Sequence, residues 1–209
     1  DAYEWLDALH LYAQPGVRYF FLVADKKGVY DKNVPPSAPA FQELINYHAR
    51  GYPIGLHPSW QSGDDERLLR EEKEMLEYIA DRGITDSRQH YIRFTLPATY
   101  RKLLQAGIKK DFSMGYGSIN GFRASIASSF NWYDLEQETP TGLLIYPFCF
   151  MDANAFYQQQ LTPQQAFTEM MHYYQVIKTV RGLMITIWHN NFLGSDKDFE
   201  GWREVYEIF

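Results

Sequence analysis

Two histidines each close an apolar run of strand length and precede a polar turn. His57 ends residues 52–57 (YPIGLH), and His189 ends residues 183–189 (LMITIWH). In α/β proteins, side chains at the carboxyl ends of strands line the ligand crevice. An imidazole placed there can bind a metal or carry a proton. A hydrogen-bonded structural role stays open for both rings, and their shared setting favours function for His189.

A third histidine lies in a run that alternates with period two. Residues 88–94 (RQHYIRF) predict a strand with Arg88 and His90 on one face. A buried arginine needs an acceptor, so Arg88 either forms a structural ion pair or holds and tunes a catalytic carboxylate. For Arg88 alone, the structural ion pair is the favoured interpretation.

Three further side chains are candidates for contact with a substrate. Asp152 follows an apolar run, where it serves either as a carboxylate at the mouth of a site or as a helix N-cap, and the cap is favoured. Tyr116 lies in the glycine-rich residues 115–121 (GYGSING), which let a backbone approach a ligand or form a tight surface loop. Trp188 directly precedes His189. We expect Tyr116, Trp188 and Asp152 to contact the substrate.

Composition excludes several classes of function. The 209 residues carry a net charge of −6, which gives no general attraction for nucleic acid or an anionic membrane. No run approaches the roughly 20 apolar residues of a membrane span. The single cysteine, Cys149, forms no disulfide within the chain and leaves the compartment open between cytoplasm and cell envelope. Motifs of nucleotide-binding proteins, serine hydrolases and zincin proteases are absent from the sequence.

Apolar runs and amphipathic segments alternate along the chain. We expect strands at residues 17–24, 54–57, 88–94, 141–150 and 183–188, and helices at 1–13, 40–50, 64–80, 96–106, 163–180 and 201–209. In the helix at 64–80, Leu68, Leu69, Met75, Leu76 and Ile79 are expected to face inward. This order predicts an α/β fold, a distorted barrel of about six to seven mostly parallel strands in one domain over residues 1–209.

Four segments together resemble the polysaccharide deacetylase family, the NodB-homology carbohydrate esterases. They are residues 54–62 (IGLHPSWQS), 87–94 (SRQHYIRF), 111–124 (DFSMGYGSINGFRA) and 185–191 (ITIWHNN), and they are most similar to a branch found in Bacteroidetes-type bacteria. The resemblance implies a distorted (β/α) barrel that removes acetyl groups from sugars with a divalent metal, commonly zinc. It therefore implies a carbohydrate substrate and a bacterial source.

The resemblance also assigns roles to individual residues. His57 matches the first histidine of the family's H-x-x-x-H metal motif, whereas Gln61 stands where the second is usual. Arg88 resembles the arginine that orients the catalytic base, and His189 resembles the late catalytic histidine. His90 replaces a usual proline, and we infer that it supplies the missing metal ligand.

The aspartate pair of the family's first motif is not found ahead of the strand expected at residues 17–24. We therefore expect that the chain lacks the family's N-terminal segment, and that it shows little activity by itself. Two functions stay open: a metal-dependent carbohydrate deacetylase, and a non-catalytic carbohydrate-binding or scaffold domain that has lost the metal site. Gln61 favours the second, and the strand-end histidines with Arg88 favour the first.

Overall fold

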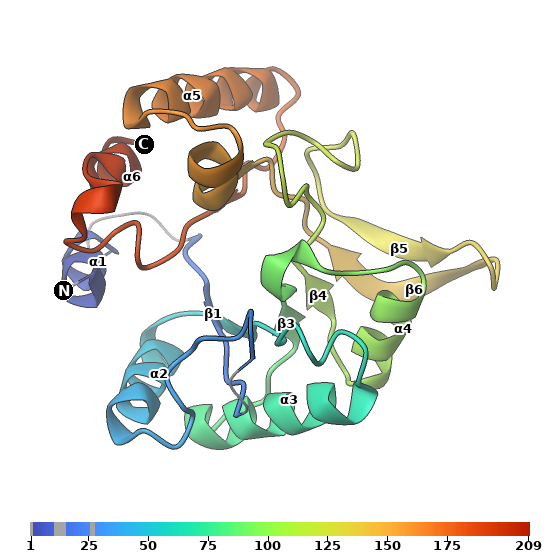
Figure 1. The fold of residues 1–209 in the computed structure, drawn as a ribbon. Helices are drawn as coiled ribbons and strands as arrows, with labels where there is room; N and C mark the ends of the chain where they lie inside the picture. The colour runs from blue at the N-terminus through green and yellow to red at the C-terminus, as the bar shows by residue number, and fades with distance from the viewer. Residues whose placement is uncertain (1, 11–15, 26–27) are drawn as a thin grey trace. The chain divides into compact units, whose positions relative to one another are not determined.

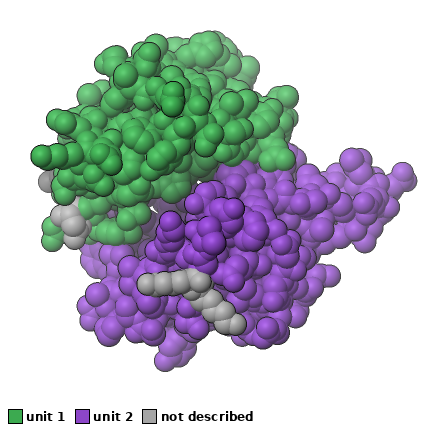
Figure 2. Space-filling model, in the orientation of Figure 1, with its two compact units in different colours: residues 1–16, 115–128, 147–209 green, residues 17–114, 129–146 purple. Residues whose placement is uncertain are grey.

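The computed structural model describes residues 2–10, 16–25 and 28–209, which form two compact units. Unit 1 contains residues 1–16, 115–128 and 147–209, and unit 2 contains residues 17–114 and 129–146 (Figure 2). Each unit is described by itself below. The expected single domain stays a prediction.

A mostly parallel sheet forms the centre of unit 2. Its six described strands lie in the order β1-β2-β3-β4-β6-β5, and neighbours are parallel except for the antiparallel pair β5 and β6. The strands are β1 (Tyr19–Phe21), β2 (Ile54–Leu56), β3 (Asp86–Ser87), β4 (Lys110–Asp111), β5 (Phe130–Asp134) and β6 (Thr139–Ile145). The predicted α/β class with parallel strands is confirmed, although the paired segments are shorter than the apolar runs.

Three helices alternate with these strands: α2 (Pro39–Gly51), α3 (Glu66–Ala80) and α4 (Ala98–Gln105) (Figure 1). Helix α3 begins at Asp65, whose side chain accepts hydrogen bonds from the backbone N–H groups of Arg67 and Leu68. The inward face of α3 was predicted only in part. Met75 is 38% exposed, whereas Glu72 is buried.

The strand predicted at residues 88–94 is wrong. Pairing in β3 ends at Ser87, and residues His90–Ile92 form a short 3₁₀ turn. Tyr91 and Ile92 adopt left-handed φ angles of 56° and 52°, which no strand permits. The alternation of apolar and polar residues therefore did not reflect two faces of a sheet.

The run at residues 141–150 is divided between the two units. Its first part belongs to β6, which pairs with the unpredicted strand β5 in a hairpin. Its last residue begins β7 (Phe150–Met151), which pairs in parallel with β8 (Thr186–Ile187) in unit 1. Apolar character alone does not show where one strand ends and the next begins.

Unit 1 also contains the helices α1 (Ala2–His10), α5 (Pro163–Thr179) and α6 (Trp202–Ile208). A short π-helical segment, Asn154–Gln158, and a 3₁₀ turn, Lys197–Phe199, belong to the same unit. Thr162 is the N-cap of α5, and Gln165 completes a capping box. The core contains Cys149, Phe150, Ala155, Ala166, Met170, Ile177, Phe192, Phe199, Trp202 and Val205. None of the helices described in either unit is long and apolar enough to span a membrane.

Candidate functional site

His57 lies where the second strand of the sheet gives way to a loop. Its backbone N–H donates to Phe21 O at 2.9 Å, which continues the ladder between β1 and β2 by one residue. On the other side, Arg88 N donates to Leu56 O at 3.0 Å, which continues the ladder between β2 and β3. These bonds bring the first residues after three neighbouring parallel strands to one edge of the sheet in unit 2.

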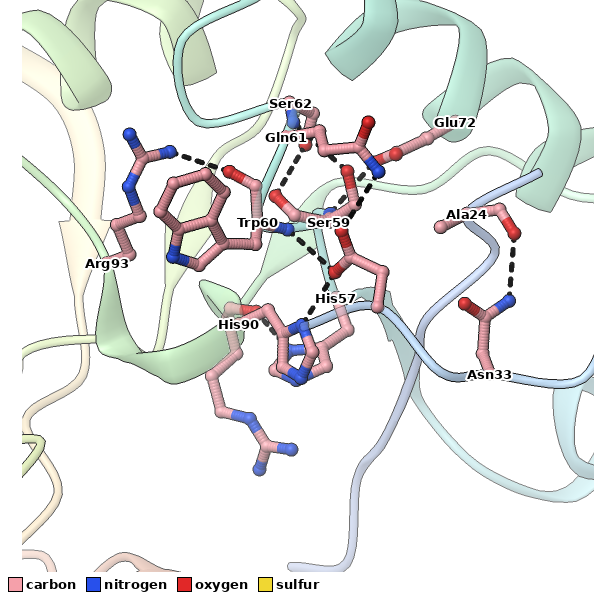
Figure 3. A network of polar contacts seen from close by, with 12 residues as sticks. Ala24, Asn33, His57, Ser59, Trp60, Gln61, Ser62, Glu72, His90 and Arg93 are labelled. Carbon is pink, nitrogen blue, oxygen red and sulfur yellow. Dashed lines mark hydrogen bonds and ion pairs between the residues drawn. The ribbon is translucent and has the colours of Figure 1, made fainter. Parts of the chain in front are cut away.

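His90 lies beside His57 at this edge (Figure 3). The centroids of the two imidazole rings are 4.9 Å apart, with an angle of 59° between the rings. The backbone N–H of His90 donates to Pro58 O at 3.3 Å, so the loop after β2 holds the turn after β3. The two rings are therefore brought together by the same pairing of strands that positions His57.

The ring nitrogens of both histidines can be assigned from their partners. His57 Nδ1 lies 2.5 Å from Arg88 O, and His90 Nδ1 lies 2.9 Å from Asp31 Oδ1. Both oxygens act only as acceptors when Asp31 is ionised, so each Nδ1 carries the hydrogen. In the neutral imidazole the lone pair is then on Nε2, which is the form that a metal ligand needs.

The spacing of the rings fits a shared metal ion. Two imidazoles bound to one zinc at about 2.0–2.1 Å with tetrahedral geometry have ring centroids roughly 5 Å apart. The observed 4.9 Å agrees with that value. Among the residues that the structure describes, however, no group of three His, Cys, Asp or Glu side chains is placed to hold an ion. His57 and His90 therefore fit as two ligands of a centre that needs further ones.

Asp31 links three parts of this site. Its Oδ1 accepts from the backbone N–H of Trp60 at 2.8 Å as well as from His90, and its Oδ2 accepts from Gln61 Nε2 at 3.3 Å. Burial of Asp31 opposes its charge, but the hydrogen bonds from Trp60, His90 and Gln61 outweigh it and hold the pKa of the carboxyl below its usual value. An ionised carboxylate on the far nitrogen of a histidine is the arrangement that orients metal-binding imidazoles.

Gln61 lies four residues after His57, where the H-x-x-x-H motif would have its second histidine, and its side chain binds Asp31. Its side-chain amide donates to Asp31 Oδ2 at 3.3 Å. A buried carboxylate with an additional donor is stabilised in its charged form. Gln61 thus supports the residue that orients His90.

A buried glutamate anchors the loop between His57 and α3. Glu72 Oε2 accepts from the backbone N–H of Ser59 at 2.9 Å, and Ser62 N donates to Ser59 Oγ at 3.0 Å (Figure 3). Burial raises the pKa of the Glu72 carboxyl, although hydrogen bonds from Ser59 and Ser62 oppose this. These contacts fix the turn that carries Trp60 and Gln61 to Asp31.

Arg88 stacks on an aromatic ring of the sheet. Its guanidinium carbon lies 4.9 Å from the centroid of Phe20, and its carbonyl accepts from His57. The backbone of Arg88 therefore orients a candidate ligand directly. Its proposed role in orienting a catalytic base stays a prediction.

In unit 1, His189 forms a pair with Asp152. The pair β7 and β8 aligns Met151 with Ile187, so Asp152 and His189 emerge together beyond the strand ends. Asp152 Oδ1 lies 2.6 Å from His189 Nδ1, and Oδ2 accepts from the His189 backbone N–H at 2.6 Å. Two bonds from one carboxylate fix both the position of the ring and its Nδ1–H tautomer.

Asp152 itself is completely buried and also accepts from Ala153 N at 2.6 Å. The following helical segment, Asn154–Gln158, has Ala153 at its N-cap position and no side-chain cap hydrogen bond, so the favoured cap role of Asp152 is wrong. The expected common position of His57 and His189 at one end of a sheet stays a prediction, because the two residues belong to different units.

The remaining candidates lie in unit 1 near β7 and β8. Trp188 packs against the rings of Phe150 and Tyr206, at 5.7 and 5.2 Å between centroids, and donates to Thr186 Oγ1. Tyr116 is half-buried, and its carbonyl accepts from Asn154 Nδ2 at 2.9 Å. Their contact with a substrate stays a prediction.

Asp111 is a buried carboxylate that links the ends of two neighbouring strands in unit 2. It is fully buried at the end of β4 and accepts from Ser87 Oγ, Ser113 Oγ and Ser113 N, each at 2.9 Å. Burial raises its pKa to about 6, against the effect of these hydrogen bonds. The three donors join the ends of β3 and β4, and Ser113 Oγ in turn accepts from Gln89 N at 2.9 Å, just before His90.

Sequence reasoning missed Asp31 and Glu72. Asp31 lies in a loop without periodicity, where nothing distinguishes it from its neighbours. Glu72 gave a usable signal, because it lies three residues after Leu69 and four before Leu76, on the buried face of α3. A charged residue at such a position indicates a polar task in the interior.

No known family model matches the sequence, and no curated protein matches it significantly. Solved structures do match. A "putative polysaccharide deacetylase" from Mycobacterium smegmatis aligns over 99% of this chain and 67% of its own, with a TM-score of 0.62 and 18% sequence identity. The Puue allantoinase aligns over 83% of this chain and 57% of its own, with a TM-score of 0.57 and 15% identity. The chain therefore has the polysaccharide deacetylase type of fold that its motifs predicted.

Proposed function

We propose that this chain is part of a metal-dependent hydrolase that removes acetyl groups from a carbohydrate. The observation that supports this most is the pair of imidazoles His57 and His90, with ring centroids 4.9 Å apart and both Nδ1 atoms held by acceptors. Structural neighbours named as a deacetylase and an allantoinase fit a hydrolase of this kind.

In this proposal His57 and His90 hold a divalent ion, for which zinc suits imidazole ligands well. When bound, such an ion polarises an acetyl carbonyl and lowers the pKa of water. The chain's own contribution is orientation: Arg88 O fixes the ring of His57, and Asp31 fixes the ring of His90. Gln61, Trp60 and Glu72 hold Asp31 and the loop in place.

His189 is proposed as the general acid that protonates the leaving amine or alkoxide. Asp152 accepts from its Nδ1–H and so directs Nε2 away from the buried carboxylate. The same carboxylate stabilises the positive charge that the ring carries before it gives up its proton. A positioned histidine of this kind contributes about 10²–10⁴-fold to a rate.

A second function is favoured by one specific observation. Gln61 replaces a metal-binding histidine and is bound to Asp31, and no third ligand accompanies His57 and His90 in the described part of the chain. A carbohydrate-binding or scaffold protein that has lost its metal fits these facts. In that case the histidines would serve only the structure of the loops.

Metal content and acetate release separate the two functions. The protein is stripped with a chelator and reloaded with zinc, and bound zinc is measured for wild type, His57→Ala, His90→Ala and the control His172→Ala, which alters an exposed histidine. We expect about one zinc in wild type and the control, and loss of zinc in the two site variants. Acetate release is then followed with acetylated oligosaccharides, and with allantoin as a comparison substrate.

Equal zinc content in wild type and both site variants would contradict the proposed centre. Zinc binding without release of acetate from any acetylated sugar by the full-length protein would contradict the proposed substrate class. Absence of zinc in wild type, together with carbohydrate binding, would establish the second function.

A further inference from the structure

A cluster of aromatic side chains lies directly beside His90 in unit 2. We call it the aromatic platform and define it as Tyr30, Trp60 and Tyr91. The rings of Tyr30 and Trp60 are stacked, with centroids 4.7 Å apart and an angle of 28°. Tyr91 meets Tyr30 edge to face at 5.3 Å.

The platform is exposed although its members are large rings. Tyr91 is 60% exposed and Tyr30 is 42% exposed. Tyr91 also contacts His90, with 4.6 Å between ring centroids, so the platform continues the surface of the candidate metal site. Exposed aromatic rings that adjoin a set of polar side chains are typical of ligand-binding surfaces.

The backbone holds Tyr91 outward at an energetic cost. Tyr91 and the β-branched Ile92 both adopt left-handed φ angles, of 56° and 52°. Such a conformation is unfavourable for residues other than glycine and is commonly found at functional sites. Its result here is that Ile92 is buried while the neighbouring Tyr91 points into solvent.

Contacts with neighbouring residues also hold Trp60, one ring of the platform, in place. The guanidinium of Arg93 covers Trp60 at 3.9 Å from the ring centroid, donates to Trp60 O at 2.6 Å and forms an ion pair with Asp64. Trp60 is thus held between Arg93 and Tyr30, and its backbone is held by Asp31. A surface that is already rigid loses little conformational entropy on binding.

We propose that the aromatic platform binds a pyranose ring of the substrate by stacking, next to the sugar that is hydrolysed. This inference rests on the proposed function, and it adds a binding subsite in which Tyr30 and Tyr91 contact the sugar. Trp60, whose ring lies between Arg93 and Tyr30, supports them. The C–H face of a pyranose is flat and weakly apolar, as an aromatic face requires, while the phenol hydroxyls can bond to the sugar's hydroxyl groups. A protein partner would instead require a larger apolar surface around these rings.

Binding is tested apart from catalysis. The full chain is titrated by calorimetry, in buffer with a chelator, with two probes: the β-1,4-linked tetramer of N-acetylglucosamine and acetylated xylotetraose. Tyr91→Ala and Tyr30→Ala should each raise the Kd of a bound probe about 2- to 10-fold. Tyr91→Phe should bind more tightly than Tyr91→Ala and more weakly than wild type, since it keeps the stacking ring and loses one hydroxyl. Tyr78→Ala is the matched control, because Tyr78 is a tyrosine 82% exposed on α3 of the same unit.

The outcomes for the subsite and for the proposed function can be told apart. Weaker binding in both alanine variants but not in the control supports the subsite, even if no acetate is released. Release of acetate from a sugar with the same kcat/KM in wild type, Tyr91→Ala and Tyr30→Ala overturns the subsite and leaves the function intact. Failure of wild type to bind either probe overturns the subsite as well.

Discussion

Removal of Asp31 tests whether the carboxylate orients a metal-binding imidazole. One oxygen of this residue, Oδ1, accepts both from His90 Nδ1 at 2.9 Å and from Trp60 N at 2.8 Å, while Oδ2 receives only the amide of Gln61. The structure therefore predicts different effects for two substitutions. Asp31→Asn keeps an oxygen at the important position, and Asp31→Ala removes it.

The magnitudes follow from these contacts. Asp31→Asn loses the charge but keeps both bonds to Oδ1, and a charge-assisted hydrogen bond exceeds a neutral one by about 1 kcal/mol. We therefore expect zinc affinity to fall about 5-fold. Asp31→Ala frees the His90 ring to turn and change its tautomer, which typically costs about 10–100-fold in metal affinity. It also leaves the Trp60 N–H without its acceptor, at about 1–3 kcal/mol of stability.

Zinc affinity is measured by competition with a chromophoric chelator, and the tautomer of His90 by nitrogen NMR of the imidazole. Asp134→Ala provides the control. Asp134 is another buried carboxylate of unit 2 and lies in the hairpin of β5 and β6. It accepts hydrogen bonds from Arg101 Nε at 2.6 Å and from Arg101 Nη2 at 2.8 Å. This variant should lower the free energy of unfolding while zinc affinity stays the same.

Wild-type zinc affinity in Asp31→Ala, with the protein folded by circular dichroism, would refute the orienting role. Equal losses in Asp31→Asn and Asp31→Ala would also refute the reasoning, because the effect would then come from charge and not from the acceptor at Oδ1.

Three further predictions concern other parts of the chain. His189→Ala should lower the kcat of deacetylation about 10²–10⁴-fold while zinc content stays constant, and an unchanged kcat would remove the ring from the mechanism. Burial raises the pKa of Asp111 in the folded protein to about 6, above the usual value for an aspartate, so its contribution to stability is full at low pH and is lost as pH rises through about 6. The free energy of unfolding of wild type relative to Asp111→Asn should therefore fall by about 2 kcal/mol from about pH 4.5 to pH 7.5 in denaturant titrations, and a rise would contradict the sign. Gly55→Ala should lower the free energy of unfolding by about 1–3 kcal/mol, because the new Cβ would lie 2.5 Å from the ring of Phe20. Gly142→Ala, which meets no atom within 4 Å, is its control and should change stability by less than about 0.5 kcal/mol.

The sequence contained enough to predict the fold class and the positions of the candidate histidines. Apolar runs of strand length before His57 and His189 correspond to β2 and β8, and polar residues follow each strand as expected. We inferred, beyond what the resemblance implies, that His90 joins His57 as a metal ligand, and the structure brings the two rings together.

The rest depended on contacts between distant residues. Asp31 reaches His90 across 59 positions of sequence, and Arg88 O reaches His57 across 31. No local pattern encodes such pairs, because loop residues lack the periodicity that buried faces impose on strands and helices. The left-handed turn at Tyr91 and Ile92 was missed because a local pattern was present but misleading. The regular alternation of residues 88–94 predicted a strand, and tertiary contacts override that local preference.

The interleaving of the two units has a consequence for the order in which the protein is made. The chain leaves unit 1 after residue 16, returns for residues 115–128, leaves again, and completes the unit only from residue 147 onward. Helix α1 must then wait for α6, the partner that supplies Tyr206 to His10 at 2.7 Å and Arg203 to the ring of Trp5. Unit 2 has all its residues once position 146 has emerged, whereas α1 finds its partner only when synthesis reaches α6. In a ribosome-bound chain that is stalled just after β6 has emerged, the sheet of unit 2 should thus resist proteolysis, whereas α1 should be cleaved.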